Sequence, residues 1–300
     1  MDSDRHAPGN PRGKSGSDQS AVPGVRDWLD LELDQPGRWL RRVPGRETFA
    51  WPAQGPAQVV VKRYRRDHPR DVIYERLRGR GSRSPGEREY ENLRALSAEG
   101  FSVPKPLGWA AEGPLSVVCM AWVPHLETLK DRLERADAAE RALWLEELAS
   151  LVARFHAAGF YHRDLYIHHL VLPVPSGPSP ELQPESQPES QPESQPAVAS
   201  AATSSGGASV TPQGLTLLDL GRVRRERSPR RRWFVKDLGA VVHSLPGSVL
   251  PGERNAFLER YFDLVGPATL GARRRQRAAI ERRRARIAAH VPRFGEEDRF

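Results

Sequence analysis

The pattern of apolar and polar residues predicts strands and one helix in the first part of this chain. Residues 59–64 (Val-Val-Val-Lys-Arg-Tyr) and 115–123 (Leu-Ser-Val-Val-Cys-Met-Ala-Trp-Val) are β-rich runs that predict strands. Between them, Ser84, Pro85 and Glu87 form a helix start, with Ser84 as N-cap in a capping box with Glu87. This helix is expected to run to about residue 98, just before a glycine.

Helical spacing takes over in the second half of the chain. A helix is expected to start after Asp137 and to end at Gly159, because its apolar residues recur at i, i+4, i+7, i+8 and i+11. These residues are Trp144, Leu148, Leu151, Val152 and Phe155. A small β-rich part followed by a larger helical part predicts an α+β, bilobal fold.

Two segments show neither pattern. Residues 1–24 are charged and rich in Gly, Ser and Pro, without the apolar stretch of a secretory signal. Residues 173–214 are mostly Pro, Ser, Gln, Glu and Ala, with a repeated Gln-Pro-Glu-Ser unit. Both segments are expected to be disordered, the second as an insert in a hairpin. The first lobe then takes residues 25–123, and the second takes 124–172 and 215–290.

Charge and cysteine content narrow the class of protein. The chain has 46 Lys and Arg against 38 Asp and Glu, a net charge of +8, and a single cysteine, Cys119. One cysteine excludes an internal disulfide framework and fits a reducing cytoplasm. No apolar run is long enough to span a membrane.

The candidate chemistry lies in two short stretches. His162-Arg163-Asp164 precedes an apolar run, and Asp219-Leu220-Gly221 follows a second apolar run. Phosphoryl transfer from ATP with Mg²⁺ uses two such aspartates. Asp164 would orient the attacking hydroxyl, and Asp219 would hold the metal. Alone, the tripeptide at 162–164 would equally suit a surface loop.

Lys62 is the third candidate, because it interrupts an otherwise apolar strand. Such a lysine either faces water on an edge strand or pairs with an ATP phosphate and a glutamate on the following helix. Glu89 lies one turn before Leu93 on the apolar face of that helix, so we favour it over Glu87 and Glu91 as the partner.

These residues resemble those of the Kdo/WaaP family of lipopolysaccharide core kinases over about residues 40–265. The similarity is carried by Val-Lys-Arg-Tyr at 61–64, Arg-Glu-Tyr-Glu-Asn-Leu at 88–93, Val-Pro-Lys-Pro-Leu at 103–107 and, above all, His-Arg-Asp-x-Tyr-Ile-x-His at 162–169. The resemblance implies a protein-kinase-like fold and an ATP-dependent kinase. The acceptor that it implies is a heptose or Kdo hydroxyl of the lipopolysaccharide inner core.

His169 stands where protein kinases have a metal-binding asparagine. An imidazole is a poor ligand for Mg²⁺, so we expect it to donate a hydrogen bond to phosphate or to Asp219. Its neighbour His168 is expected to be a partly exposed strand residue. Backbone groups from Ala121 to Val123 are the candidates to bind adenine.

The remaining expectations concern supporting residues. Arg163 or nearby arginines would offset the developing charge, beside His162 in the same loop. The stretch before the Lys62 strand has one glycine, so Arg42 or Arg46 could contact phosphate there, although a plain hairpin turn fits equally well. The Asp237 carboxylate would accept hydrogen bonds from backbone N–H groups of the loop that contains His162, Arg163 and Asp164.

Arginines form two clusters that suit a phosphorylated, acidic acceptor. The first cluster follows Gly221 and contains Arg222, Arg224, Arg225, Arg227 and Arg230 to Arg232. The second cluster lies on an expected C-terminal helix and contains Arg273 to Arg275, Arg277, Arg282 to Arg284 and Arg286. For the second cluster, an arginine-rich helix that simply faces solvent is an equally good explanation. Both clusters could hold the protein peripherally on the anionic cytoplasmic face of the inner membrane. Nucleic acid is a less favoured partner.

Two alternatives differ in function. One is an atypical protein kinase or another small-molecule phosphotransferase, which the arginines after Gly221 and the lack of an Ala-Pro-Glu segment disfavour. The other is a catalytically dead kinase fold that binds anionic membrane or nucleic acid. Retention of Lys62, Glu89, Asp164 and Asp219 disfavours it.

Overall fold

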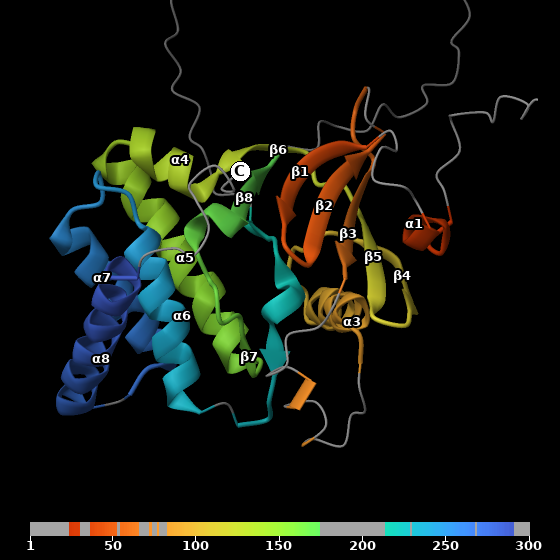
Figure 1. Cartoon of the computed structure of the whole chain (residues 1–300). Helices are drawn as coiled ribbons and strands as arrows, with labels where there is room; N and C mark the ends of the chain where they lie inside the picture. The colour runs from red at the N-terminus through yellow and green to blue at the C-terminus, as the bar shows by residue number, and fades with distance from the viewer. Residues whose placement is uncertain are drawn as a thin grey trace, which may run out of the picture.

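The computed structural model describes residues 24–30, 37–52, 55–65, 72–73, 77, 83–174, 214–228, 230–267 and 269–290. Almost all of the expected N-terminal tail and of the Gln-Pro-Glu-Ser insert therefore lies outside the described residues. Figure 1 shows a sheet in one part of the molecule and a group of helices in the other.

The first lobe is built on an antiparallel sheet. Its order is β1 (Arg38–Val43), β2 (Arg46–Trp51), β3 (Val59–Tyr64), β5 (Leu115–Ala121) and β4 (Pro106–Glu112). β3 is central, and all but one of its residues are buried. Its β-branched residues favour this position, because they pack well on both faces of a sheet. The edge-strand alternative for this segment is therefore wrong.

Helix α3 (Pro85–Ala98) packs against β3, β4 and β5. Ser84 caps it as predicted, with its hydroxyl accepting from the Glu87 N–H at 3.2 Å. The predicted capping box is only half formed, because the Glu87 carboxylate lies 4.0 Å from the Arg83 guanidinium instead. Glu89 lies on the buried face of the helix with Leu93 and Leu96.

A short helix, α1 (Asp27–Asp30), covers a second, smaller core against the sheet. Trp28 packs against Phe49 and Trp51, with ring centroids 5.6 and 6.2 Å apart. The Arg63 guanidinium donates to the Trp28 carbonyl at 2.6 Å, which links this helix to β3.

The second lobe is helical. It contains α4 (Leu129–Arg135), α5 (Ala138–Ala157), α6 (Arg231–Ser244), α7 (Pro251–Val265) and α8 (Leu270–Ala288). Helix α5 packs against α7, and α6 packs against α8 (Figure 1). All five predicted apolar positions of α5 are buried, so this helix forms the core of the lobe as expected.

Two small sheets join the loops between these helices. β8 (Leu170–Pro173) lies between β6 (His125–Thr128) and β9 (Thr216–Leu217), while β7 (Phe160–Tyr161) pairs with β10 (Arg224–Arg225). β8 and β9 are antiparallel, with Leu170 opposite Leu217 and Val171 opposite Thr216. The predicted hairpin pairing is thus confirmed, and it places the loop before β8 beside the loop after β9.

Asp237 on α6 fixes the loop that follows β7. Its two carboxylate oxygens accept the backbone N–H groups of His162 and Arg163, each at 2.6 Å. His156 Nε2 lies 3.4 Å from the same carboxylate, and its Nδ1 lies 2.8 Å from the Tyr261 hydroxyl. The role expected for Asp237 is confirmed, and His156 is a buried structural residue.

The hydrophobic core is continuous between the two lobes. Leu93 and Leu96 of α3 belong to the same cluster as Phe155 of α5 and Phe101, which lies between them in the chain. Phe101 contacts Phe155 edge-on, with centroids 5.7 Å apart. The predicted α+β, bilobal architecture is confirmed. Within the described residues, no helix has the length and apolar character needed to cross a membrane.

We predict that Asp237→Asn lowers the free energy of unfolding by about 3 kcal/mol, because one of two buried N–H groups would lose its acceptor. Urea unfolding followed by tryptophan fluorescence measures this change. Asp263→Asn is the matched control: its side chain is 55% exposed and pairs with Arg273 on the surface, so it should cost less than about 1 kcal/mol. Equal losses in the two variants would contradict the role assigned to Asp237.

Candidate active site

A buried ion pair joins the sheet to helix α3. Lys62 Nζ on β3 donates to Glu89 Oε1 at 2.6 Å, and the Tyr64 hydroxyl donates to the other oxygen of the same carboxylate. The structure therefore brings Lys62 to Glu89, as the helical spacing predicted. The Glu91 carboxylate lies 3.9 Å from Arg94 on another face of α3.

Asp219 is the second carboxylate beside Lys62. Its Oδ1 accepts from Lys62 Nζ at 3.0 Å and from Arg46 Nη1 at 3.4 Å. Its backbone is left-handed, with φ of 54°, a conformation that is costly for a residue other than glycine and that clusters at functional sites. The Asp219 side chain is 26% exposed, so this carboxylate can reach a bound molecule.

The charges of this group stabilise one another. Burial alone would raise the pKa of Asp219, but Lys62, Arg46 and His169 outweigh it and hold the pKa well below its usual range. Burial alone would lower the pKa of Lys62, but Asp219 and Glu89 outweigh it and the pKa is raised. Lys62 is thus a cation and Asp219 an anion at neutral pH.

Arg46 reaches this site from the hairpin between β1 and β2. The turn at Pro44 and Gly45 places Arg46 at the start of β2, opposite Tyr64 of β3. Arg42 points elsewhere, with its Nε 3.6 Å from Glu47. Of the two arginines considered from the sequence, the structure places Arg46 at Asp219 and Arg42 away from it.

Asp164 lies in the loop that Asp237 holds. Its side chain is 27% exposed, it pairs with the Arg222 guanidinium, and Lys236 Nζ lies 3.9 Å from its other oxygen. Arg163, which precedes it, has a φ of 75°, a second left-handed residue in this region. Asp164 therefore faces two cations and solvent.

Lys236 was not identified from the sequence. It lies one residue before Asp237 on α6, and this position was the available signal. Its pKa is lowered to about 8, chiefly by burial and also by Arg222, Arg163 and Arg283, against the opposing effect of Asp164. A lysine with a pKa near neutral pH beside a candidate catalytic aspartate is typical of a functional site.

His169 lies between the two aspartates. Its Nδ1 is 3.3 Å from the Asp164 carbonyl and its Nε2 is 3.9 Å from Asp219 Oδ2. Burial lowers the pKa of His169 to about 3, so the ring is neutral at physiological pH. The His162 ring is stacked on the His169 ring, with centroids 6.1 Å apart.

The predicted placement of His168 in a strand was wrong. Residues 167–169 form a 3-10 turn, because the His169 N–H donates to the Tyr166 carbonyl at 3.0 Å. His168 is exposed on this turn and stacks on Tyr166.

The segment after β5 was expected to bind adenine. The N–H groups of Ala121 and Trp122 already donate to the carbonyls of Lys105 and Gln58, both at 2.8 Å. His125 Nδ1 lies 2.9 Å from the Val123 carbonyl. The Val123 N–H has no acceptor among the described residues, and it is therefore the candidate donor that remains.

The carboxylate of Asp219 suits a metal ion that takes most of its other ligands from phosphate and water. The described residues contain no group of three or more His, Cys, Asp or Glu side chains that could hold an ion. Asp219 offers one partly exposed carboxylate beside Lys62, and Mg²⁺ is commonly held by one or two carboxylates plus phosphates and water. The neutral His169 ring is a weaker candidate, since Mg²⁺ prefers oxygen.

The arginines after Gly221 divide into two groups. Arg222 contacts Asp164, whereas Arg224, Arg225 and Arg227 line a cavity beyond α3. Of these four arginines, the structure thus places Arg222 at Asp164, and the expectation that the cluster recognises an acidic acceptor stays a prediction. Arg224 and Arg225 form β10, which pairs with β7, and Arg227 follows two residues later.

Comparisons with known proteins agree with this geometry. A model of the lipopolysaccharide kinase (Kdo/WaaP) family matches residues 32–181. The 3-deoxy-D-manno-octulosonic acid kinase of Xanthomonas campestris pv. campestris (strain B100) is 29% identical over 151 residues, 47% of this chain and 60% of the relative. The enzyme of the same name from Stenotrophomonas maltophilia (strain K279a) is 30% identical over the same shares. The matched region therefore spans less than two thirds of these relatives.

A solved structure described as WaaP in complex with acyl carrier protein has the same fold. It superposes with a TM-score of 0.58 at 18% identity, covering 87% of this chain and 95% of that chain. The predicted protein-kinase-like fold is thereby confirmed. Since the family model covers half of the sequence, and the fold agrees, this chain belongs to the lipopolysaccharide kinase (Kdo/WaaP) family.

Proposed function

We propose that this protein transfers the γ-phosphoryl group of ATP to a sugar hydroxyl of the lipopolysaccharide inner core. The main support for this proposal is the position of Lys62, which is buried on the central strand of the sheet and paired with both Glu89 and Asp219. Kdo (3-deoxy-D-manno-octulosonic acid) is favoured over heptose as the acceptor, because the two similar enzymes are named as kinases of this sugar.

ATP would be held from three sides. Lys62 would contact the phosphates, as the corresponding lysine does in protein kinases, with Glu89 fixing its position. Arg46, 3.4 Å from Asp219, would supply the positive charge that backbone N–H groups of a glycine-rich loop supply elsewhere. The Val123 N–H would donate to adenine. Asp219 would hold Mg²⁺, which neutralises phosphate charge when bound.

The acceptor hydroxyl would bind beside Asp164. The Asp164 carboxylate would orient this hydroxyl and accept its proton, while Arg222 and Asp237 hold the carboxylate and its loop in place. Lys236 and Arg163 would offset the negative charge that develops on the transferred group. A neutral ring has a single N–H, which the Asp164 carbonyl places on Nδ1, so Nε2 of His169 beside Asp219 would accept a hydrogen bond rather than donate one to phosphate.

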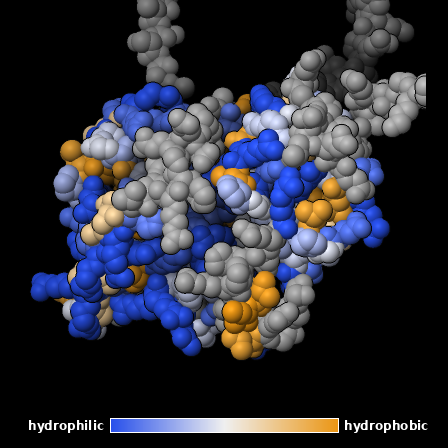
Figure 2. Space-filling view, in the orientation of Figure 1, coloured by the Kyte–Doolittle hydropathy of each residue, from blue (hydrophilic) through white to orange (hydrophobic). Residues whose placement is uncertain are grey.

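The surface supports a peripheral position on an anionic membrane face. Figure 2 shows hydrophilic side chains over the part of the molecule where α6 and α8 lie. Arg273 and Arg277 of α8 pair with Glu259 on α7, so they act within the lobe. The exposed arginines of α8 are those that could contact phosphate head groups: Arg274, Arg275, Arg282 and Arg286.

For the proposed reaction, we first predict that Asp164→Asn leaves the fold intact and lowers the rate of phosphoryl transfer about 10²- to 10⁴-fold, as expected for a positioned acid or base. Circular dichroism checks the fold, and phosphate transfer from ATP to core oligosaccharide that lacks its phosphate checks the rate. Asp263→Asn should keep wild-type turnover. Activity of Asp164→Asn within a few-fold of wild type would remove Asp164 from the mechanism.

The second prediction concerns pH. Lys236 is cationic below its pKa of about 8 and loses its charge as the pH rises through that value, so kcat/KM should fall there. Lys236→Arg keeps the positive charge, and the alkaline fall should move to higher pH. Lys130→Arg on the exposed face of α4 is the control and should leave the profile unchanged. An unchanged alkaline limb in Lys236→Arg would show that another group titrates.

A further inference from the structure

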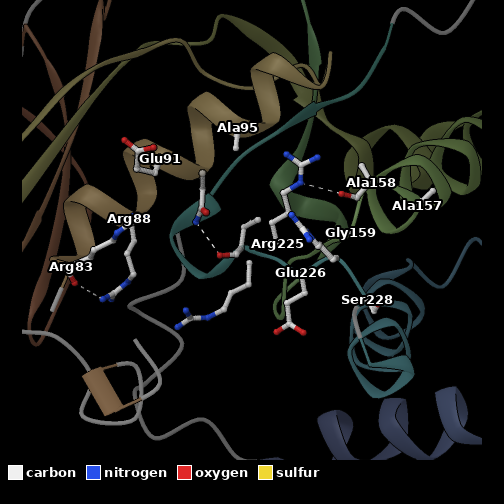
Figure 3. Close-up of a pocket in the computed structure, with 14 residues that line it drawn as sticks. Arg83, Arg88, Glu91, Ala95, Ala157, Ala158, Gly159, Arg225, Glu226 and Ser228 are labelled. Carbon is white, nitrogen blue, oxygen red and sulfur yellow. Dashed lines mark hydrogen bonds between the residues drawn. The ribbon is translucent and has the colours of Figure 1, made fainter. Parts of the chain in front are cut away.

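A cavity outside the candidate active site contains a concentration of arginines. It has a volume of about 970 Å³ and lies between α3, the end of α5 and the segment around β10 (Figure 3). Its arginines come from two distant parts of the chain: Arg83, Arg88, Arg224, Arg225 and Arg227. This volume is at the upper end of the range for small-molecule sites.

The cavity is separate from the site around Lys62. Its α3 wall is formed by Arg88, Glu91, Asn92 and Ala95, which share one face of the helix, whereas Glu89 is buried on another face. Lys62, Asp164 and Asp219 do not line it.

The charge of the cavity is strongly unbalanced. Five arginines line it against two glutamates, Glu91 and Glu226, and Arg225 also pairs with Glu99 outside the lining, which leaves an excess of two positive charges. Glu226 accepts the Tyr161 hydroxyl at 2.6 Å, and Glu91 lies 3.9 Å from Arg94. An excess of guanidinium groups around a concave surface favours the binding of an anion, because their mutual repulsion is relieved when an anion binds.

Contacts with the backbone hold two of these arginines in place. Arg88 Nη1 donates to the Arg83 carbonyl at 2.8 Å, and Arg225 Nε donates to the Ala158 carbonyl at 3.3 Å (Figure 3). The Arg225 guanidinium also pairs with Glu99 and lies 4.9 Å from the Phe160 ring centroid. Guanidinium groups held in this way lose little entropy on binding phosphate.

We propose that this cavity binds a multiply phosphorylated anion. Arginine forks match phosphate oxygens bidentately, and several forks spread over a large, polar cavity match more than one phosphate group. The phosphates could belong to a free metabolite or to the head group of a phosphorylated glycolipid. This assignment rests on the cavity alone and does not depend on the proposed reaction.

The walls of the cavity connect it to the active site. The Asn92 amide donates to the carbonyls of Leu220 and Val223, at 2.9 and 3.0 Å, directly after Asp219. An anion that contacts Arg88 on α3 and Arg227 beyond β10 would therefore tie α3 to the segment that follows Asp219. Its binding stabilises the arrangement in which Glu89 faces Lys62.

The test measures binding of inorganic pyrophosphate to the full chain by calorimetry. The double variant Arg88→Gln/Arg227→Gln should raise the Kd at least about tenfold, because charge-assisted hydrogen bonds are lost. Arg274→Gln/Arg275→Gln on α8 removes the same charge from an exposed face and should change Kd less than about threefold. Arg46→Gln reports pyrophosphate bound beside Asp219, and it therefore separates binding there from binding in the cavity.

Three results would overturn the proposal: undiminished binding by the double variant, an equal loss in the α8 control, or a loss confined to Arg46→Gln. Hydrogen exchange over residues 85–98 should slow with pyrophosphate in wild type and not in the double variant. Exchange that is unaffected in wild type would contradict the link to α3.

Vesicles distinguish the two sources of phosphate. Binding to phosphatidylcholine vesicles that contain bisphosphorylated lipid A, and loss of that binding in the double variant, would assign the site to a glycolipid. Equal vesicle binding by both proteins, with the pyrophosphate difference kept, would assign it to a free anion. Either result supports an arginine site for phosphate.

Discussion

The structure depends on a lysine buried in the central strand of its sheet. Lys62 cannot be placed there as a cation without compensating charge, because burying an isolated ammonium group costs several kcal/mol. Glu89 and Asp219 supply that charge from two other segments. Helix α3 must therefore keep Glu89 facing β3, and the loop after β9 must approach the same point. Removing one partner of such a buried pair costs about 3–5 kcal/mol.

In the second lobe, hydrogen bonds to the backbone hold the segments that contain Asp164 and Asp219 in position. Asp237 holds the loop before Asp164, and pairing of β8 with β9 places Asp219 beside it. Arg163 and Asp219 both have left-handed backbones, which these contacts maintain against their conformational cost. Charge stabilisation and backbone geometry thus bring four dispersed residues, Lys62, Glu89, Asp164 and Asp219, to neighbouring positions.

Local patterns in the sequence were sufficient for part of this arrangement. Spacing on one helix identified Glu89, and a strand of β-branched residues identified Lys62, because both signals are contained in a few consecutive residues. Lys236 and the contact of Arg222 with Asp164 were not predicted, since they depend on how α6 packs beside the loop that contains Asp164. For the same reason, the position of Arg224 and Arg225 beside the cavity was not predicted, since it is set by the pairing of β10 with β7.

The most direct test of the account follows labelled phosphate from γ-labelled ATP into purified inner-core oligosaccharide, with the product sugar identified by mass spectrometry. Wild-type protein should transfer the label to a single core hydroxyl, and Lys62→Met should bind the acceptor but transfer none. Label transfer that Lys62→Met leaves undiminished, or the absence of transfer to any core sugar by folded wild-type protein, would contradict the assignment of the buried lysine to phosphoryl transfer.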